Sequence, residues 1–371
     1  MIYFDHAATT PVSDEVLAAM LPYFSSSFAN ASGSYASARS ARAAIDRARS
    51  EVAAAIGAKP AEIYFTSGGS EADNWAIMGA ASAYPQKKHI MTTAIEHHAV
   101  LHACQALEKR GYEVTYLPVD EKARVLPEDF ARAIRSDTLI ASVMLANNEV
   151  GTIEPVEQLS KIAHEHGVMM HTDAVQAAGH IPVDVDMLDV DMLSLSAHKF
   201  GGPKGCGALY VRRGVRLDNL IYGGAQERGM RAGTENVPAI VGMGKALSYA
   251  QQNMEKHAEQ IAALRDALQE SLLQLGGVRM NGDQANRLPG HLHVSIGGAN
   301  TQLLLMQLDM AGIAVSAGSA CTSGSAERSH VIQAMGLAGG NQADIRFTLS
   351  ENNTNEEIAA ACEAMRRILK R

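Results

Sequence analysis

An α/β fold is predicted for this chain of 371 residues, with a large domain built on a mainly parallel, helix-covered sheet and a smaller α+β domain at the C-terminal end. Three observations predict it. Between about residues 36 and 250, short apolar runs alternate with helical patterns, which is typical of a parallel sheet covered by helices. Beyond residue 250 this alternation stops. The chain is also too long for one small core, so we expect two domains.

The elements of the large domain follow from the alternating runs. Apolar runs predict strands at residues 63–65, 89–93, 113–117, 139–145, 168–172, 192–196 and 208–211. Helical patterns separate many of them, at residues 36–56, 71–81, 100–109 and 156–166. Gly57 ends the first of these helices and Gly111 stops the third. Functional sites in such sheets collect at the carboxyl ends of the strands.

The rest of the chain predicts the smaller domain. A long helix of charged and apolar residues is expected at about residues 250–275, and strands are expected near 291–296, 313–316 and 345–349. The last helix begins at Thr354, which has the spacing of a capping box with Glu357. We therefore expect a large domain of residues 16–250 and a small domain of residues 1–15 and 251–371.

Composition excludes several classes of protein. The net charge of −8 provides no basic surface, so nucleic acid is not expected as a partner. No apolar run approaches the length of a membrane span, and the first residues lack the pattern of a signal peptide. The cysteines are scattered and form no CxxC pair, which indicates free thiols in the cytoplasm and no metal site. Their positions are 104, 206, 321 and 362.

Lys199 is the residue that points most directly to chemistry. It follows the apolar run of residues 192–196 and precedes glycines and a proline, so it stands where a buried strand ends in a sharp turn. An amine held there loses water, which favours its neutral, nucleophilic form. Such amines form Schiff bases with carbonyl cofactors, above all pyridoxal phosphate. Taken alone, Lys199 would be interpreted first as a solvated surface charge, because most lysines are.

Two other segments fit the same site. Asp173 follows the strand of residues 168–172, and a carboxylate there can keep a pyridine nitrogen protonated; it can also merely cap the next turn. The glycines of residues 66–71 lie between a strand and a helix, where backbone amides favour an anion. That turn also occurs in any α/β protein. Asp173 precedes Lys199 by one further strand, so both can line one pocket.

Three more residues are candidates, each with a plainer alternative. His97 follows a strand and can stack on a flat cofactor or move protons, although any histidine can be a surface residue. Cys321 lies in a small, polar run with no apolar period, which predicts a thiol displayed on a mobile loop rather than a buried one. Arg346 stands alone among apolar residues, as an interior ion-pair partner or as a clamp for a substrate carboxylate.

Together these segments resemble those of the cysteine desulfurases, in the class V aminotransferase family of fold-type I pyridoxal-phosphate enzymes. The resemblance extends over nearly the whole chain. It rests on residues 3–11, 66–74, 96–97, 147–151, 173–176, 196–205, 231–234, 319–322 and 345–347. The Lys199 segment and the cysteine run are specific together, whereas either alone leaves the substrate open.

The resemblance implies a role for each matching residue. Lys199 bonds the cofactor and later moves protons, and Cys321 takes sulfur from L-cysteine as a persulfide and leaves L-alanine. His97 stacks on the ring, and Asp173 pairs with its nitrogen. By the same resemblance, Asn148 and Gln176 contact the ring oxygen. The phosphate is held by Gly69, Ser70, Ser196 and His198, and Thr234 reaches the phosphate bound in a second subunit. Arg346, with Asn148, binds the substrate. The implied partners are a second copy of the chain and sulfur acceptors such as an iron–sulfur scaffold protein.

One departure and three alternatives remain. The family commonly has a histidine near the position of Tyr35, so any role of that histidine is in doubt here. A selenocysteine lyase is the first alternative, because selenium can leave without a protein thiol. An aminotransferase for small amino acids is the second. A non-catalytic subunit that displays a sulfur-carrying cysteine is the third, although it would not need Lys199 and Asp173.

Overall fold

The computed structural model describes residues 1–318, 328–337 and 341–369. Its largest sheet has seven strands in the order β2-β8-β7-β6-β5-β3-β4. Their bounds are β2 Ile63–Thr66, β3 His89–Thr93, β4 Glu113–Leu117, β5 Thr138–Ser142, β6 Met169–Asp173, β7 Met192–Ser196 and β8 Gly207–Val211. Every neighbouring pair from β7 to β4 is parallel, and only β8 runs against its two neighbours. The predicted mainly parallel sheet is confirmed.

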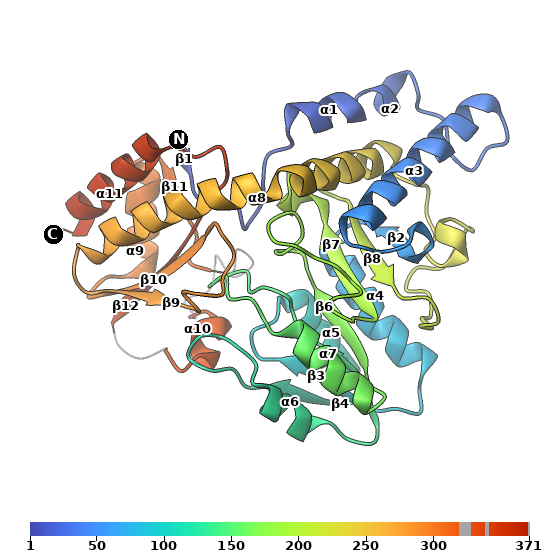
Figure 1. Cartoon of the computed structure of the whole chain (residues 1–371), viewed down its shortest axis with the longest axis horizontal. Coiled ribbons are helices and arrows are strands. Elements are labelled where there is room, and N and C mark those ends of the chain that lie inside the picture. The colour runs from blue at the N-terminus through green and yellow to red at the C-terminus, as the bar shows by residue number, and fades with distance from the viewer. Residues whose placement is uncertain (319–327, 338–340, 370–371) are drawn as a thin grey trace.

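Helices cover both faces of this sheet (Figure 1). One face packs with α3 (Ala36–Ala55), α6 (Pro127–Ala133), α7 (Val156–Glu165) and the first half of α8 (Val237–Leu273) in a shared apolar core. The opposite face packs with α4 (Gly69–Ala83) and α5 (His98–Glu108) in a second core. Short helices α1 (Asp14–Met20) and α2 (Pro22–Ser25) precede α3. Both faces are therefore buried, as the continuous apolar runs in the strands require.

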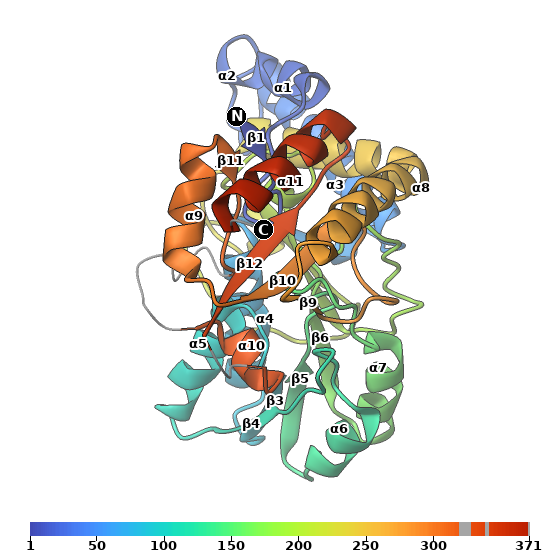
Figure 2. The ribbon, with the colours of Figure 1, turned by 90° about the vertical axis from the view of Figure 1, so that its left-hand side faces the viewer.

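A second group of elements surrounds a three-stranded antiparallel sheet of order β12-β10-β9 (Figure 2). Its strands are β9 Val278–Asn281, β10 His291–Gly297 and β12 Gln342–Thr348. A separate pair joins β1 (Ile2–Tyr3) to β11 (Ile313–Ala314) in parallel. The helices of this part are α9 Thr301–Met310, α10 His330–Ala334 and α11 Asn355–Leu369. Three single turns complete the chain: η1 Pro60–Glu62, η2 Ala197–Lys199 and η3 Glu227–Gly229.

Helix α8 differs most from its prediction, because it begins at Val237 rather than near residue 250. Asn236 caps it by accepting a hydrogen bond from the Ala239 N–H at 3.3 Å, and a proline occupies its first turn. The first turns of the helix were missed because they contain two glycines, and glycine weakens a helical sequence pattern. The helix passes the expected domain boundary at residue 250 without a break. The division into residues 16–250 and the remainder stays a prediction.

The end of the chain follows its expected capping pattern. The Glu357 N–H donates to Thr354 Oγ1 at 3.3 Å, and the Thr354 N–H donates to Glu357 Oε2 at 3.2 Å. This reciprocal pair is the predicted capping box, and α11 starts at the next residue. Within the described ranges, none of the helices has the length and apolar character to cross a bilayer.

Candidate active site

A cavity of about 520 Å³ opens at the carboxyl ends of β6 and β7, which are neighbours in the middle of the sheet. Its wall contains ten of the predicted residues together with parts of the N-terminal segment. The predicted ones are Gly69, Ser70, His97, Asn148, Asp173, Gln176, Ser196, His198, Lys199 and Arg346. The fold thus brings together segments as far apart in the chain as Ala7 and Arg346, and the site lies at the strand ends, as the rule for parallel sheets predicts.

Lys199 lies in the single turn η2 directly after β7. Its Nζ donates hydrogen bonds to the backbone oxygens of Ala7 and Ala8, the latter at 3.0 Å. The Thr10 N–H donates to the His198 oxygen at 2.9 Å, so the N-terminal segment is tied to the lysine turn. A side chain at Gly202 would place its Cβ 2.8 Å from the Ala197 oxygen, which explains the glycine in this turn. The turn therefore aims the amine into the cavity.

Asp173 is the last residue of β6 and is buried. Burial raises the pKa of Asp173 to about 6, although the Val175 N–H, at 2.9 Å from Oδ1, and the charge of Lys199 act to lower it. Gln176 lies one turn further along and donates from Nε2 to the Ala7 oxygen at 3.0 Å. Because Asp173 faces the same cavity as Lys199, it is placed to hold a cationic nitrogen of a bound ring.

His97 caps the N-terminus of α5 and lines the cavity. Its Nδ1 accepts a hydrogen bond from the Ala99 N–H at 3.2 Å, which assigns the ring proton to Nε2. Burial and then the charge of Lys199 lower the pKa of His97 to about 4. The ring is therefore neutral near pH 7, a state suited to stacking on a flat cofactor.

The N-terminus of α4 forms the phosphate-sized end of the cavity. A side chain at Gly69 would place its Cβ 2.6 Å from Val175 Cγ2, so only glycine allows this close approach of the backbone. Backbone amides at the first turn of a 15-residue helix favour an anion, and Ser196 and His198 line the cavity as well. The residues present thus fit a phosphorylated, carbonyl-bearing cofactor.

An ion pair that the sequence did not indicate supports this end of the cavity. Arg231 donates from Nε to Glu71 Oε1 at 2.7 Å and from a terminal nitrogen to Glu71 Oε2 at 2.9 Å. The Ser67 N–H also donates to the Glu71 carboxylate, at 2.8 Å. Both segments were part of the resemblance, yet pairing between residues 160 positions apart has no signal in one sequence. The pair holds the loop before α8 against the first turn of α4.

Arg346 has the interior ion pair that the sequence offered as one of its two roles, and its contact with a substrate stays a prediction. It is buried in β12, pairs with Asp5 Oδ1 at 2.7 Å and donates to the Asn148 oxygen at 2.9 Å. It also lines the cavity, so an ion pair and contact with a substrate are both compatible with its position. Asp5, Ala7 and Ala8 belong to the segment of residues 3–11, which contributes to the family resemblance. The contacts of this segment were not predicted.

For two predicted site residues the structure does not test the expected role. Thr234 is exposed and does not line the cavity of its own chain. Its contact with a second subunit stays a prediction. Cys321 lies in residues 319–327, outside the described residues, so its predicted display on a loop is not tested. The other three cysteines are buried free thiols, which confirms the buried positions expected for Cys104 and Cys362.

Known proteins are similar to this chain over nearly its whole length. The model of the aminotransferase class-V family matches residues 2–360. Cysteine desulfurase IscS of Methanosarcina thermophila is 49% identical over 372 residues, which cover 100% of this chain and 92% of that protein.

Two solved structures are also similar over almost the whole chain. A NifS-like protein has a TM-score of 0.94 and 38% identity, with 100% of this chain and 99% of that chain covered. SspA in complex with cysteine has a TM-score of 0.84 and 37% identity, with 95% and 100% covered. With a full-length family match and a cavity of the expected composition, this chain belongs to the class-V aminotransferase family.

Proposed function

We propose that this protein is a pyridoxal-phosphate-dependent cysteine desulfurase that converts L-cysteine to L-alanine and holds the sulfur on Cys321. The observation that carries the proposal is the convergence of Lys199, Asp173 and His97 on one cavity in a chain 49% identical to a cysteine desulfurase. The cysteine bound in the similar SspA structure supports L-cysteine as the substrate.

The cavity residues divide the work of holding the cofactor. When bound, pyridoxal phosphate supplies an electron sink for the substrate carbon. The Lys199 amine bonds the cofactor, the Asp173 carboxylate pairs with its ring nitrogen, and the neutral His97 ring stacks on it. Asn148 and Gln176 contact the ring oxygen. The phosphate is held by the first turn of α4 through Gly69 and Ser70, with Ser196 and His198 from the lysine segment.

Sulfur transfer then uses four residues of this chain. Arg346 binds the carboxylate of L-cysteine, and Asn148, whose oxygen Arg346 contacts, borders the same position. Lys199 Nζ takes the proton from the substrate Cα and later returns a proton to the carbon skeleton. The Cys321 thiolate attacks the substrate sulfur, the carbon–sulfur bond breaks, and a persulfide forms on Cys321. The remaining carbon skeleton, after protonation, leaves as L-alanine.

The proposal includes a homodimer. Large apolar side chains are exposed in the segment before α3: Leu21 55%, Phe24 62%, Phe28 75% and Tyr35 56%. A patch of this kind marks a contact surface. Tyr35 precedes α3, and Arg42 on that helix pairs with Glu235 at 2.9 Å, next to the exposed Thr234. A second copy seated on this patch would bring its own phosphate end close to Thr234.

The destination of the sulfur and the compartment complete the proposal. Sulfur-acceptor proteins, such as a scaffold for iron–sulfur clusters or a thiolation protein, take the persulfide sulfur from Cys321. A cytoplasmic location is supported by Cys104, Cys206 and Cys362, which are free thiols in the described structure.

The test is turnover of L-cysteine by the purified holoprotein, with alanine and protein-bound sulfur measured together. Wild type is expected to form both, whereas Cys321→Ala loses sulfur transfer and keeps the visible absorbance of the cofactor. Cys362→Ala, a cysteine far from the cavity wall, is the matched control. Full activity of Cys321→Ala on cysteine would contradict the proposal. Activity on selenocysteine alone would indicate a lyase, and a colourless protein would indicate a non-catalytic subunit.

A further inference from the structure

A polar strip crosses the middle of the main sheet on the face that α4 covers. Ser142 Oγ lies 2.8 Å from His171 Nδ1, and His171 Nε2 lies 3.0 Å from Ser194 Oγ. These residues come from the neighbouring strands β5, β6 and β7. Asp173 follows His171 by two positions, so its side chain emerges on the same face. The strip therefore leads from the interior of the sheet to the carboxylate that faces the cofactor cavity.

Asp73, on the helix α4 that covers this face of the sheet, adds a carboxyl group to the strip. Its side chain is buried and lines the same cavity as Asp173. Its Oδ1 lies 3.8 Å from His171 Nε2 and has no hydrogen-bond partner within the described part of the chain. An unpartnered carboxyl oxygen in the interior is costly if the group is charged, and much less so if it is neutral. Nothing in the proposed mechanism so far uses this residue.

The charged and titratable groups around Asp73 all disfavour its ionisation. Burial raises the pKa of Asp73 well above its usual value, and the charges of Asp173 and Glu96 raise it further. His171 does not supply a compensating positive charge, because burial lowers the pKa of His171 to about 3. Asp173 has the Val175 N–H and the charge of Lys199 in favour of its ionised form. Two neighbouring buried carboxyls with unequal surroundings divide into one acid and one carboxylate.

We propose that Asp73 is a positioning residue that remains a neutral carboxylic acid. It keeps the one proton that Asp73 and Asp173 share, so the negative charge lies on Asp173, where the ring nitrogen of the cofactor would bind. This inference rests on the proposed pyridoxal-phosphate function. The neutral acid also remains a hydrogen-bond donor inside the cavity wall. An asparagine reproduces its shape, neutrality and donor, whereas a leucine, which is branched in a similar way but bulkier, reproduces only its neutrality.

Infrared spectroscopy observes the proton directly. Holoprotein with ¹³C at the aspartate side-chain carboxyls separates these groups from buried glutamates such as Glu96. Wild type at pH 7.5 is expected to show one labelled carboxylic-acid band, which disappears in Asp73→Asn and persists in Asp173→Asn. A band that persists in Asp73→Asn, or its absence from wild type, would overturn the proposal. This measurement reports protonation alone, so its result remains interpretable even if the protein has no activity on cysteine.

Cofactor affinity from pH 5 to 9 provides the second arm, measured by equilibrium titration of pyridoxal phosphate into cofactor-free protein. The affinity of Asp73→Asn for pyridoxal phosphate is expected to lie within about threefold of the wild-type affinity, with the same midpoint in its dependence on pH. Asp73→Leu should bind pyridoxal phosphate about 10- to 100-fold more weakly near pH 6, with the midpoint of binding at a higher pH, because a polar group beside the Asp173 charge is replaced by an apolar one. Asp173→Asn should be weak at every pH. If Asn and Leu at position 73 weaken binding equally, the role is refuted. If wild type itself does not bind the cofactor, the proposed function fails instead.

Discussion

Lys199 shows how much of one residue's chemistry depends on its surroundings. Its position after a buried strand was evident in the sequence, but the backbone oxygens that orient Nζ come from Ala7 and Ala8, more than 190 residues earlier. The N-terminal segment is therefore one wall of the site. The same segment supplies Asp5, which pairs with Arg346.

Replacement of Lys199 is expected to abolish turnover. Lys199→Ala removes both the amine that bonds the cofactor and the base at the substrate carbon, so the rate of alanine formation should fall by about 10³-fold or more. Lys161→Ala is the matched control, because Lys161 is exposed on α7 and pairs with Glu157 at the surface. A Lys199→Ala protein that kept a tenth of wild-type turnover would contradict the assigned role.

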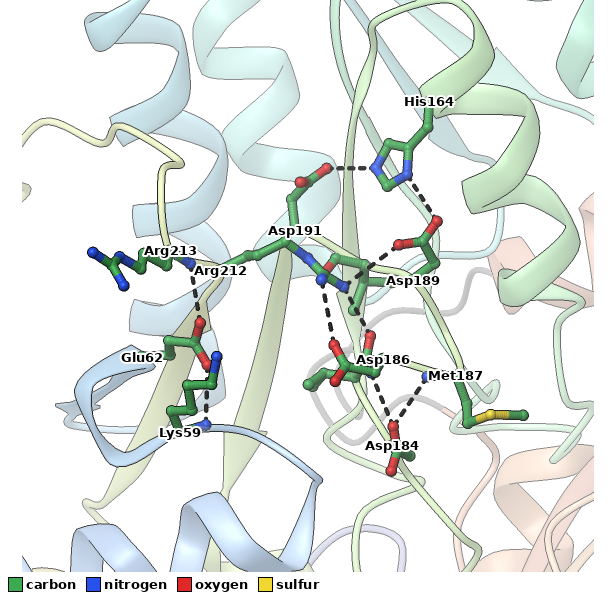
Figure 3. Close-up of polar contacts among 12 residues, drawn as sticks. Lys59, Glu62, His164, Asp184, Asp186, Met187, Asp189, Asp191, Arg212 and Arg213 are labelled. Atoms are coloured by element: carbon green, nitrogen blue, oxygen red, sulfur yellow. Dashed lines mark hydrogen bonds and ion pairs between the residues drawn. The ribbon is translucent and has the colours of Figure 1, made fainter.

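At the scale of elements, a network of charges fastens the end of α7 to the start of β7 (Figure 3). His164 lies between two carboxylates, with Nδ1 3.0 Å from Asp189 Oδ2 and Nε2 3.0 Å from Asp191 Oδ2. Arg212, after β8, pairs with Asp186 and Asp189. Burial acts to lower the pKa of His164, but the bonds and charges of Asp191 and Asp189 outweigh it and raise the pKa above the ordinary value.

The stability of this network is expected to depend on pH. A histidine whose pKa is raised by folding stabilises the native state below the unfolded pKa of about 6.5, and the contribution is lost as pH rises through the folded value. His164→Gln should therefore lower the free energy of unfolding by up to about 1 kcal/mol at pH 6, after screening at this half-exposed site, and by less at pH 9. Urea unfolding at both pH values measures this, with the exposed His166→Gln as control. An equal loss at pH 6 and pH 9 would show that His164 acts without its charge.

The contact between α3 and α8 explains why α8 tolerates glycines in its first half. A Cβ at Gly244 would lie 2.8 Å from the backbone Cα of Ala48 on α3, so the two helices approach too closely for any side chain. The glycine that weakened the helical pattern in the sequence is thus required by the packing of two helices.

Gly244→Ala is expected to destabilise the protein although alanine is the better helix former. Overpacking at a well-filled contact costs about 1–3 kcal/mol, which exceeds the gain in helix propensity of roughly 1 kcal/mol. Thermal unfolding of the holoprotein should show a lower Tm. Lys245→Ala, the next residue and exposed, should change stability by less than about 0.5 kcal/mol. A raised Tm for Gly244→Ala would mean that α3 and α8 can separate at little cost.

On the scale of the whole molecule, the cavity joins the two groups of elements. Arg346 comes from the small antiparallel sheet, Asp173 comes from the large sheet and Lys199 from the turn after its strand β7, and Ala7 and Ala8 come from the N-terminal segment. Helix α8 packs its first half on one core and its second half on the other. The site is complete only when these parts are held in register.

Association of two chains is expected to depend on the exposed segment before α3. The double variant Phe24→Glu, Phe28→Glu would place unpaired charges in the proposed interface and should raise the dimer dissociation constant by about 100-fold or more. Sedimentation measures the change in mass, and cofactor affinity should fall with it if Thr234 acts across the interface. Met306→Glu with Met310→Glu on α9, equally exposed, is the control. A double variant that remains dimeric at low concentration would place the interface elsewhere.

The sequence by itself determined the strands of the large sheet and the helices α3, α4, α5 and α7, because local apolar periodicity and turn residues are visible one segment at a time; it missed α1, α2, α6 and the first half of α8. It also identified Lys199, Asp173 and His97, since each follows a strand whose end faces the same edge of a parallel sheet. Only the tertiary structure revealed the contacts between distant segments. These are Lys199 with Ala7, Glu71 with Arg231, Arg346 with Asp5, and Asp73 beside Asp173. Their partners are chosen by how helices and sheets pack in space, and that packing leaves no local pattern in the chain.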